Sequence, residues 1–269
     1  MPEISEGLPK PPPVPDYVVR NRAMWTAANA RYTAARARES WARNDVSWGV
    51  WKVPEDEIHA LPDVRGLDVI ELGCGTAYFG AWLKKLGAAR VVGIDITPAQ
   101  LATARDLNNE FRMGLEFIEA NAEDVPLPDA SFDLAFSEYG ASIWCDPYLW
   151  IPEAARLLRR GGELMFLQSS TLQLLCSADE AQVSERLVNP QKGMRRFDWT
   201  AEDEPSTEFH ISGSDMFKLL NDSGLDVVDF RELYAPADAV DHPYYSYVPV
   251  AWAKRWPAEE IWRARKRRG

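Results

Sequence analysis

Short apolar runs alternate with amphipathic stretches through the middle of the chain. In the amphipathic stretches apolar residues recur at the 3.6-residue period of a helix, whereas the apolar runs are bounded by glycine, proline or polar residues, as buried strands are. The predicted strands are 68–72, 90–96, 115–118, 132–137, 163–168, 225–230 and 244–250. The predicted helices are 78–86, 98–109, 148–160 and 214–221.

Strands separated by helices of this length run parallel, because each helix must cross over the sheet before the next strand begins. We therefore expect an α/β fold with a doubly wound, mostly parallel, seven-stranded Rossmann-like sheet and helices on both faces. The helical period also covers residues 16 to about 43, where no Pro or Gly interrupts it. An N-terminal helical extension is therefore expected to precede the sheet.

The chain is expected to form one core domain with additions at both ends. The core comprises residues 59–251, and its acidic stretch 169–212 reads as an irregular insertion. The predicted additions are a disordered proline-rich lead at 1–15, a helical cap or lid at 16–58, and a C-terminal helix with a basic tail at 252–269. Pro257 is placed to open that last helix, over 256–265.

Composition and charge restrict the possible partners. The chain has 269 residues, a hydrophobic fraction of 46% and a formal charge of −11, which argues against a nucleic-acid backbone as the main partner. The basic run 263–268 is interpreted as a solvated helix end rather than a nucleic-acid arm. No apolar stretch approaches the ~20 residues of a membrane span, and the N-terminus lacks the apolar core of a secretory signal.

The three cysteines, Cys74, Cys145 and Cys176, show no metal-ligand spacing, and any disulfide would leave one of them unpaired. A reduced, cytoplasmic protein without a bound metal is the simplest interpretation.

The most informative segment is a predicted strand that runs into a glycine turn and then a helix, Val69-Ile70-Glu71-Leu72-Gly73-Cys74-Gly75-Thr76-Ala77. Glycines at such a turn allow a ligand to approach the backbone, and the following helix offers unpaired N–H groups. Two glycines after a strand also fit a tight turn without a ligand, so the turn alone is weak support for a binding site.

Three polar features at fixed distances strengthen the case for a ligand. Glu71, two residues before the first glycine, suits a cationic partner such as an α-ammonium group and would repel a pyrophosphate. Asp95 ends the next strand, where a carboxylate can accept both hydroxyls of a ribose. Asn121 and the backbone that follows it can read an adenine edge.

These motifs, taken in order, resemble the class I S-adenosylmethionine-dependent methyltransferases, and within them the small-molecule branch called type 11. The resemblance covers roughly residues 60–170 and is carried by 71–76, 93–95, 121–126, 131–134 and 157–162. It implies S-adenosylmethionine as the cofactor and a methyltransferase domain over the core. Two positions depart from the family pattern: Ala77 replaces a usual third glycine, and Asn121 replaces a frequent Asp.

The resemblance also implies roles for individual residues. The implied cofactor-binding residues are Glu71, Gly73, Cys74 and Gly75 at the methionine end, Asp95 at the ribose, Ile96 on the adenine face, Asn121, Ala122 and Glu123 at the adenine edge, and Ser137 near the sulfonium. Residues that precede the core often cover the cofactor in this family, so Trp48 and Trp51 are either part of a lid or packing residues for the N-terminal helix.

Candidate catalytic residues follow the fourth predicted strand. Glu138 and Tyr139 lie where an acceptor would have to bind, and His210 could approach from the insertion. Glu138 is interpreted as a base or as a solvated acid, Tyr139 as a pocket wall rather than a base, and His210 as a base or a structural residue.

The expected function is in-line methyl transfer to a small-molecule acceptor at O, N or C, in which alignment of the reactants supplies most of the acceleration. Two alternatives stay open: a nicotinamide-dependent oxidoreductase on a similar sheet, and a protein that binds the cofactor without turnover.

Overall fold

The computed structural model describes residues 14–179, 181–200, 205–241 and 245–268. Its centre is a seven-stranded sheet in the order β10-β11-β7-β6-β3-β4-β5. The strands are β3 (Asp68–Leu72), β4 (Arg90–Asp95), β5 (Glu116–Glu119), β6 (Phe132–Glu138), β7 (Leu158–Ser169), β10 (Leu225–Leu233) and β11 (Glu259–Lys266). All are parallel except β11, which runs antiparallel to both of its neighbours. The predicted fold class is confirmed.

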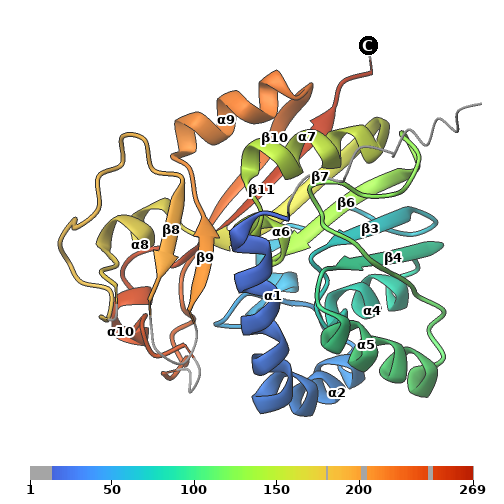
Figure 1. The fold of residues 1–269 in the computed structure, drawn as a ribbon, viewed down its shortest axis with the longest axis horizontal. Helices are drawn as coiled ribbons and strands as arrows, with labels where there is room; N and C mark the ends of the chain where they lie inside the picture. Colours follow the sequence, from blue (N-terminus) through green and yellow to red (C-terminus); the bar gives the residue numbers. More distant parts are fainter. Residues whose placement is uncertain (1–13, 180, 201–204, 242–244, 269) are drawn as a thin grey trace, which may run out of the picture.

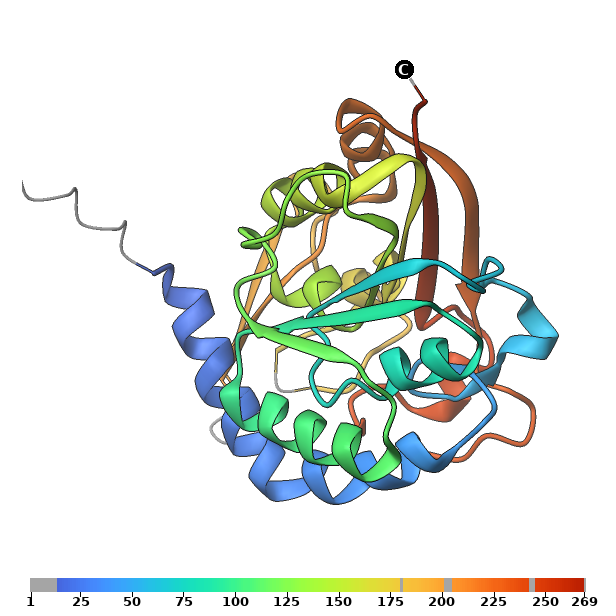
Figure 2. The same cartoon turned by 90° about the vertical axis from the view of Figure 1, so that its right-hand side faces the viewer.

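Helices cover both faces of the sheet (Figures 1 and 2). The helices are α4 (Tyr78–Lys85) and α5 (Pro98–Phe111) on one face, and α7 (Pro147–Leu157) and α9 (Gly213–Asp222) on the other. Successive side chains of a strand point to opposite faces, and β6 shows this directly. Leu134 and Phe136 pack in the core under α4, whereas Ala135 packs under α7. The central strands β3, β4 and β6 are therefore buried on both sides, which explains why they read as continuous apolar runs.

The N-terminal cap begins with three consecutive helical segments, α1 (Asp16–Ala28), a π-helical turn η1 (Asn29–Thr33) and α2 (Ala34–Ala42). It confirms the helix predicted from residue 16 to about 43. The indole N–H of the fully buried Trp41 donates to the Thr76 carbonyl oxygen at 2.8 Å, and Lys85 donates to the carbonyl oxygens of Trp41 and Arg43. The end of α2 is thus fixed to the glycine turn and to α4.

A short β1–β2 hairpin (Ser47–Trp48 and Val53–Pro54) and the single turn α3 (Glu55–Ile58) join the cap to the sheet. Trp48 is fully buried against Phe79 and Phe136, and Trp51 is buried in the same core. Trp48 and Trp51 are interpreted from the sequence either as part of a lid or as packing residues, and these contacts agree with the role of packing residues.

The predicted insertion is more regular than expected. It contains α8 (Thr171–Cys176) and an antiparallel hairpin of β8 (Arg196–Trp199) and β9 (Ser206–Phe209). With α10 (Val250–Ala253), these elements form a side lobe at the left of Figure 1, with a small core of its own around Leu174, Leu175 and Met194. Helix α1 is bound to this lobe, because Asn21 exchanges two hydrogen bonds with the Thr207 backbone at 2.8 and 2.9 Å.

The segment 256–265 is not the predicted helix but the strand β11. It fills the gap between β7 and β10, where its backbone pairs on both sides and its apolar side chains are buried. The basic residues near its end form ion pairs instead of a solvated tail: Arg263 and Arg265 with Glu163, and Arg267 with Asp226.

Two further boundaries differ from prediction. The described part of 244–250 is a turn that leads into α10 and contributes no strand. Helix α7 ends at Leu157, and the residues before Gly161 and Gly162 already belong to β7, because Leu158 pairs with Phe132 of β6.

Residues 1–13 of the predicted disordered lead lie outside the described residues. No helix among the residues that are described is long and apolar enough to cross a bilayer.

Replacing Trp41 with Phe removes the indole N–H but keeps an aromatic ring in place. We expect the free energy of unfolding to fall by about 1–3 kcal/mol, because the Thr76 carbonyl oxygen loses a buried hydrogen bond. Trp41→Ala also leaves a cavity and is expected to cost about 3–5 kcal/mol. Urea-induced unfolding measures both values, and equal stability of the Phe variant and the unchanged protein would contradict the anchoring role.

Candidate functional site

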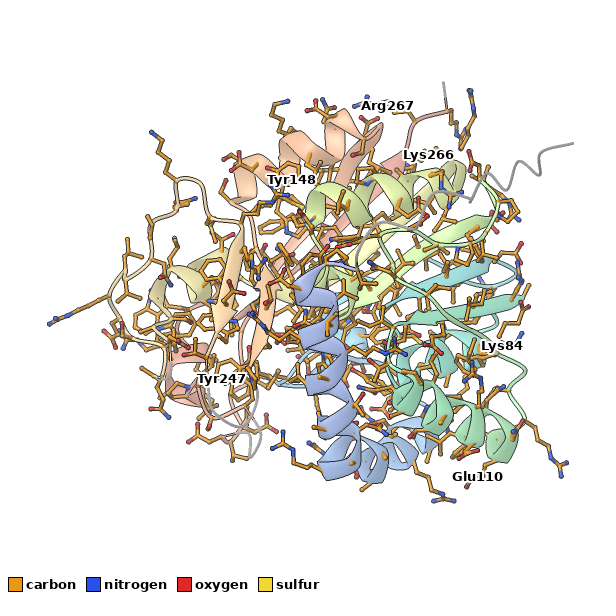
Figure 3. The ribbon with its side chains drawn as sticks, in the orientation of Figure 1. Lys84, Glu110, Tyr148, Tyr247, Lys266 and Arg267 are labelled. Atoms are coloured by element: carbon orange, nitrogen blue, oxygen red, sulfur yellow. The ribbon has the colours of Figure 1, made fainter. Side chains whose placement is uncertain are left out.

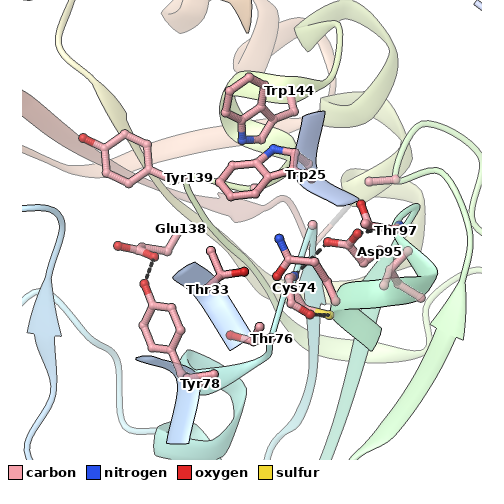
Figure 4. Close-up of a pocket in the computed structure, with 18 of the residues that line it drawn as sticks. Trp25, Thr33, Cys74, Thr76, Tyr78, Asp95, Thr97, Glu138, Tyr139 and Trp144 are labelled. Carbon is pink, nitrogen blue, oxygen red and sulfur yellow. Dashed lines mark hydrogen bonds between the residues drawn. The ribbon is translucent and has the colours of Figure 1, made fainter. Parts of the chain in front are cut away.

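The site lies where the strand order reverses. The chain proceeds from β3 outward through β4 to β5, then crosses back to place β6 on the other side of β3. Loops after the carboxyl ends of β3 and β6 must diverge there, which opens the crevice that doubly wound sheets use for ligands. A cavity of about 340 Å³ occupies this crevice under α1 and α2. We call it the first chamber; Figure 4 shows part of its lining.

Glycine in the turn after β3 is required by backbone packing. Gly73 has φ of +73°, and a Cβ built there would lie 2.5 Å from the Ala141 amide nitrogen. A Cβ on Gly140 would lie 2.3 Å from the Gly73 carbonyl oxygen. The backbones of the loops after β3 and β6 are therefore in direct contact where the loops cross. This contact is the main reason that Gly73 must be a glycine, and the expected approach of a ligand is a secondary one.

Asp95, at the tip of β4, holds the turn together while facing the chamber. Its carboxylate accepts hydrogen bonds from the backbone N–H of Gly75 at 2.8 Å and of Thr97 at 2.7 Å. Burial raises the pKa of Asp95, while these backbone hydrogen bonds work in the opposite direction. Each carboxylate oxygen has a second lone pair, so Asp95 can also accept hydroxyl groups of a ligand.

One part of the first chamber has a lining without charged side chains. It is lined by Ile96, Asn121, Ala122 and Cys145, together with the side chain of Gln100. Asn121 is oriented by its own turn, because its Oδ1 accepts the Glu123 N–H at 3.1 Å. An apolar face beside an amide and free backbone groups is suited to a flat heterocycle.

Another part carries an acid–phenol pair and basic side chains. Glu138 accepts a short hydrogen bond from the Tyr78 hydroxyl, drawn as a dashed line in Figure 4. Arg43 stacks on the Trp82 ring, which in turn contacts Tyr78. The basic residues that line the chamber are Arg36, Arg43 and Lys52.

Burial raises the pKa of Glu138 to about 7, although the hydrogen bond from Tyr78 lowers it. Glu138 can therefore take up or release a proton near neutral pH, as a general base must. Burial and the neighbouring Glu138 carboxylate raise the pKa of Tyr78 further above its usual value, so Tyr78 acts as a hydrogen-bond donor.

A second chamber of about 520 Å³ adjoins the first. It lies between α1, α6 (Ala141–Trp144) and the side lobe. Trp25, Val50, Tyr139 and Trp144 line both chambers. Trp25 and Trp144 meet edge to face, with ring centroids 5.4 Å apart, and Figure 4 shows them beside Tyr139. These residues form the boundary between the two spaces.

Comparison with known proteins finds similarity to methyltransferases in the region of this site. Residues 70–166 match the family model described as a methyltransferase domain. The malonyl-[acyl-carrier protein] O-methyltransferase of Serratia marcescens is 34% identical over 46% of this chain and 48% of its own length. The ubiquinone/menaquinone biosynthesis C-methyltransferase UbiE of Enterobacter sp. (strain 638) is 28% identical over 67% of this chain and 74% of its own length.

Among solved structures, an S-adenosylmethionine-dependent methyltransferase from Mesorhizobium loti has a TM-score of 0.65 at 24% identity and covers 81% of this chain and 100% of its own, which shows the shared fold. Residues 70–166 are thus similar to a methyltransferase domain, and the fold of the chain is that of a solved S-adenosylmethionine-dependent methyltransferase. The chain spans about half the length of the first curated relatives that it matches.

Most of the residues predicted for the site line the first chamber. They are Gly73, Cys74, Gly75, Asp95, Ile96, Asn121, Ala122, Glu138 and Tyr139. Their roles towards the cofactor remain proposals.

Two predicted acids do not line the first chamber. Glu71 lies buried behind the glycine turn, where its carboxylate accepts the Gly80 N–H at 3.0 Å. It therefore cannot be the direct partner of an α-ammonium, and it does not crowd a pyrophosphate site either. The Tyr17 hydroxyl donates to the Glu123 carboxylate, at 2.8 Å from Oε1 and 2.6 Å from Oε2. Glu123 therefore connects α1 to the core instead of contacting adenine.

Ser137 and His210 are also turned away from the chamber. Ser137 is fully buried, and its hydroxyl donates to the Leu72 carbonyl oxygen at 2.8 Å, which holds β3 to β6. His210 is buried under the side lobe, where it pairs with Glu208 at 2.9 Å. His210 lines neither chamber, so the structure does not bring it to the residues of the site.

Sequence reasoning missed the residues that the cap contributes. Trp25, Arg36 and Arg43 line the first chamber from the cap, but the helical period of that region says only that one side is apolar. Tyr78 was recognised as the start of a helix, and its pairing with Glu138 depends on the tertiary fold. Ala77, which replaces the usual third glycine, has φ of +56° and does not line the chamber.

Replacing Tyr78 with Phe removes the hydrogen bond that stabilises the ionised form of Glu138. We expect the pKa of Glu138 to rise above its value of about 7. Carbon-13 NMR of glutamate-labelled protein over a pH series measures this pKa, and a Glu138→Gln sample assigns the resonance. An unchanged or lower pKa would show that Tyr78 does not stabilise the carboxylate.

Proposed function

We propose that this chain transfers the methyl group of S-adenosylmethionine to a small-molecule acceptor. The main support is the first chamber, where a carboxylate, an uncharged part and a basic part line one crevice within a region matched by the methyltransferase family model. The same family match favours methyl transfer over the nicotinamide-dependent alternative.

The residues present fit this cofactor. Asp95 would accept the ribose hydroxyls, Ile96 would pack on the purine, and Asn121 with the Ala122 backbone would contact its edge. Arg36, Arg43 and Lys52 would attract the carboxylate of the methionine part, and Glu138, when ionised, would add negative charge near a sulfonium. Thr76, between Gly75 and α4, is held against α2 by Trp41 and keeps this end closed.

When bound, the cofactor supplies a methyl group on a positively charged sulfur, which leaves with the electron pair of the broken carbon–sulfur bond. The protein has to align the acceptor with that bond and to keep water out. Trp25, Trp144 and Tyr139 stand at the passage between the chambers and would orient the acceptor there.

For a hydroxyl acceptor, we assign the base to Glu138. Its carboxylate would accept the hydroxyl proton as the oxygen gains the methyl carbon, and a pKa of about 7 suits this task near neutral pH. Tyr139 is not a base in this proposal. Its hydroxyl donates to Glu259 at 2.6 Å, and burial beside that acid raises the pKa of Tyr139 well above its usual value.

Cofactor binding is tested by isothermal titration calorimetry with S-adenosylhomocysteine. We expect binding by the unchanged protein, and Asp95→Asn and Asp95→Ala to weaken it at least about tenfold through loss of charge-assisted hydrogen bonds to the ribose. Asp106→Ala, which removes an exposed acid from α5, is the matched control. Thermal denaturation checks that each variant is folded. Binding of NADH without binding of S-adenosylhomocysteine would reverse the proposed cofactor.

Catalysis is tested by radiolabelled methyl transfer from S-adenosylmethionine into fractionated cell extract, followed by mass spectrometry of the labelled product. With a hydroxyl acceptor identified, the turnover rate should rise with pH and level off above about 7, because Glu138 must be deprotonated to act. Glu138→Gln should lower turnover by about 10²–10⁴ and abolish this pH dependence, with affinity for S-adenosylhomocysteine nearly unchanged. Unchanged turnover in that variant would remove Glu138 from the mechanism.

A further inference from the structure

We propose that the second chamber is the acceptor site and that it selects a ring-bearing acceptor that is neutral or cationic and donates a hydrogen bond, while it rejects carboxylates. This inference rests on the proposed methyl transfer and deepens it by naming the class of acceptor. Four features of the chamber support it: its aromatic walls, its boundary with the first chamber, the sign of its charges and its unpaired amide oxygen.

The walls of the second chamber are mainly aromatic. Three tryptophans and three tyrosines line it: Trp25, Trp144, Trp199, Tyr139, Tyr245 and Tyr247. The last two pack with ring centroids 4.1 Å apart, and Figure 3 shows Tyr247 in the side lobe, far from α4 and α5, which carry Lys84 and Glu110. Flat, rigid apolar walls favour a flat ligand, because aromatic rings can stack on them or meet them edge to face.

The boundary between the chambers places a bound ring next to the cofactor space. Trp25 and Val50 come from the cap and the loop after β1, and Tyr139 and Trp144 come from the loop after β6 and from α6. Tyr139 is held in place: φ is +50°, its N–H donates to the Leu167 carbonyl oxygen, and its hydroxyl donates to Glu259. Strain of this kind persists only where the surrounding structure over-determines the conformation.

The charges of the second chamber are acidic. Among its described lining residues the charged side chains are Asp179 and Glu208, and none is Lys, Arg or His. Glu208 bonds to His210, which lies outside the chamber. The basic side chains line the first chamber instead, where the cofactor's carboxylate would lie. A carboxylate in the second chamber would lose hydration and face like charges.

An unpaired amide oxygen adds a requirement for hydrogen-bond donation. Gln173 and Tyr245 are each more than nine-tenths buried and line the second chamber. Gln173 Oε1 has no hydrogen-bond partner among the described residues, whereas Gln173 Nε2 donates to Ser177. The Tyr245 hydroxyl interacts with Tyr139, Tyr247 and Ser169 and is a second polar atom at this wall. An orphaned carbonyl oxygen can accept only from a donor, so a ligand hydroxyl or amine satisfies it and a carboxylate does not.

The names of the relatives show why the proposed preference of the second chamber for a ring over a carboxylate matters. Their names include a malonyl-[acyl-carrier protein] O-methyltransferase and a quinone-biosynthesis C-methyltransferase, which represent an acidic acyl group and a ring. The second chamber of this chain is suited to the ring and not to the acid.

The test is calorimetric binding of three matched probes at neutral pH: 2-naphthol, 2-naphthoate and naphthalene. Each probe is titrated into the protein alone and into the protein that already contains S-adenosylhomocysteine. Binding of S-adenosylhomocysteine itself is measured in the same series of experiments. We expect 2-naphthol to bind at least about tenfold more tightly than 2-naphthoate, since a desolvated like-charge contact costs at least that much. Asp179→Lys, at the exposed rim, should reduce this preference.

Two variants locate the probe. Tyr245→Phe and Gln173→Met should weaken binding of 2-naphthol about fivefold each, through loss of one hydrogen bond, and leave naphthalene unchanged. The exposed Tyr234→Phe is the control, and thermal denaturation verifies folding.

Preference for 2-naphthoate, equal weakening of naphthalene by the two variants, or no binding of any probe would overturn the inference. If S-adenosylhomocysteine still binds in such a case, the proposed function stands and only the acceptor class is wrong. If S-adenosylhomocysteine fails to bind while 2-naphthol binds with the expected preference, the chamber assignment stands and the proposed reaction falls.

Discussion

The site depends on the contact between two backbone turns, one after β3 and one after β6. Gly73 and Gly140 let these turns cross at a distance that no Cβ would permit, and Ser137 adds a hydrogen bond from β6 to the last carbonyl of β3. The crossing lies at the point where the strand order reverses, so it fixes the floor of the crevice and the direction in which Glu138 and Tyr139 leave the sheet. A bulkier residue at either glycine would separate the strands that carry the site.

Acidic side chains cluster around this floor at an energetic cost. Burial raises the pKa of Glu71, Asp95, Glu138 and Glu259, and several of these carboxylates also repel one another. Such an arrangement is unfavourable without a ligand, but it is suited to a permanent cation. A sulfonium cannot lose its charge by releasing a proton, so the electrostatic attraction persists at every pH at which the acids are ionised. The cluster therefore agrees with the proposed cofactor better than any single residue does.

The cap and the side lobe convert an open crevice into two spaces. Helix α1 is bonded to the core through Tyr17 and Glu123 and to the side lobe through Asn21 and Thr207. It thereby carries Trp25 to the boundary between the chambers. Basic residues line the first chamber together with acids, whereas the charged residues that line the second chamber are acidic, so the carboxylate of the proposed cofactor would be attracted to the first chamber alone.

The amino-acid sequence by itself determined the sheet core and the turn that holds the proposed cofactor. Strands buried on both faces give continuous apolar runs, and the helices between them show an apolar period of 3.6 residues. Both patterns are local, so they can be recognised without knowing which elements pack against each other. For the same reason Asp95, Asn121 and Glu138 could be placed at strand ends. Local signals failed for β11, whose strand conformation comes from pairing with β7 and β10 on both sides, while its sequence period resembles that of a helix.

Only the tertiary structure decided which polar side chains reach the site. Glu71 and Ser137 sit in the expected strands, but the pleat and the backbone crossing turn them inward, towards Gly80 and Leu72. Tyr78, Trp25 and Gln173 were not foreseen, because their roles arise from neighbours that lie far away in the chain. Side-chain direction and long-range contacts depend on packing between elements, and no local pattern of residues encodes them.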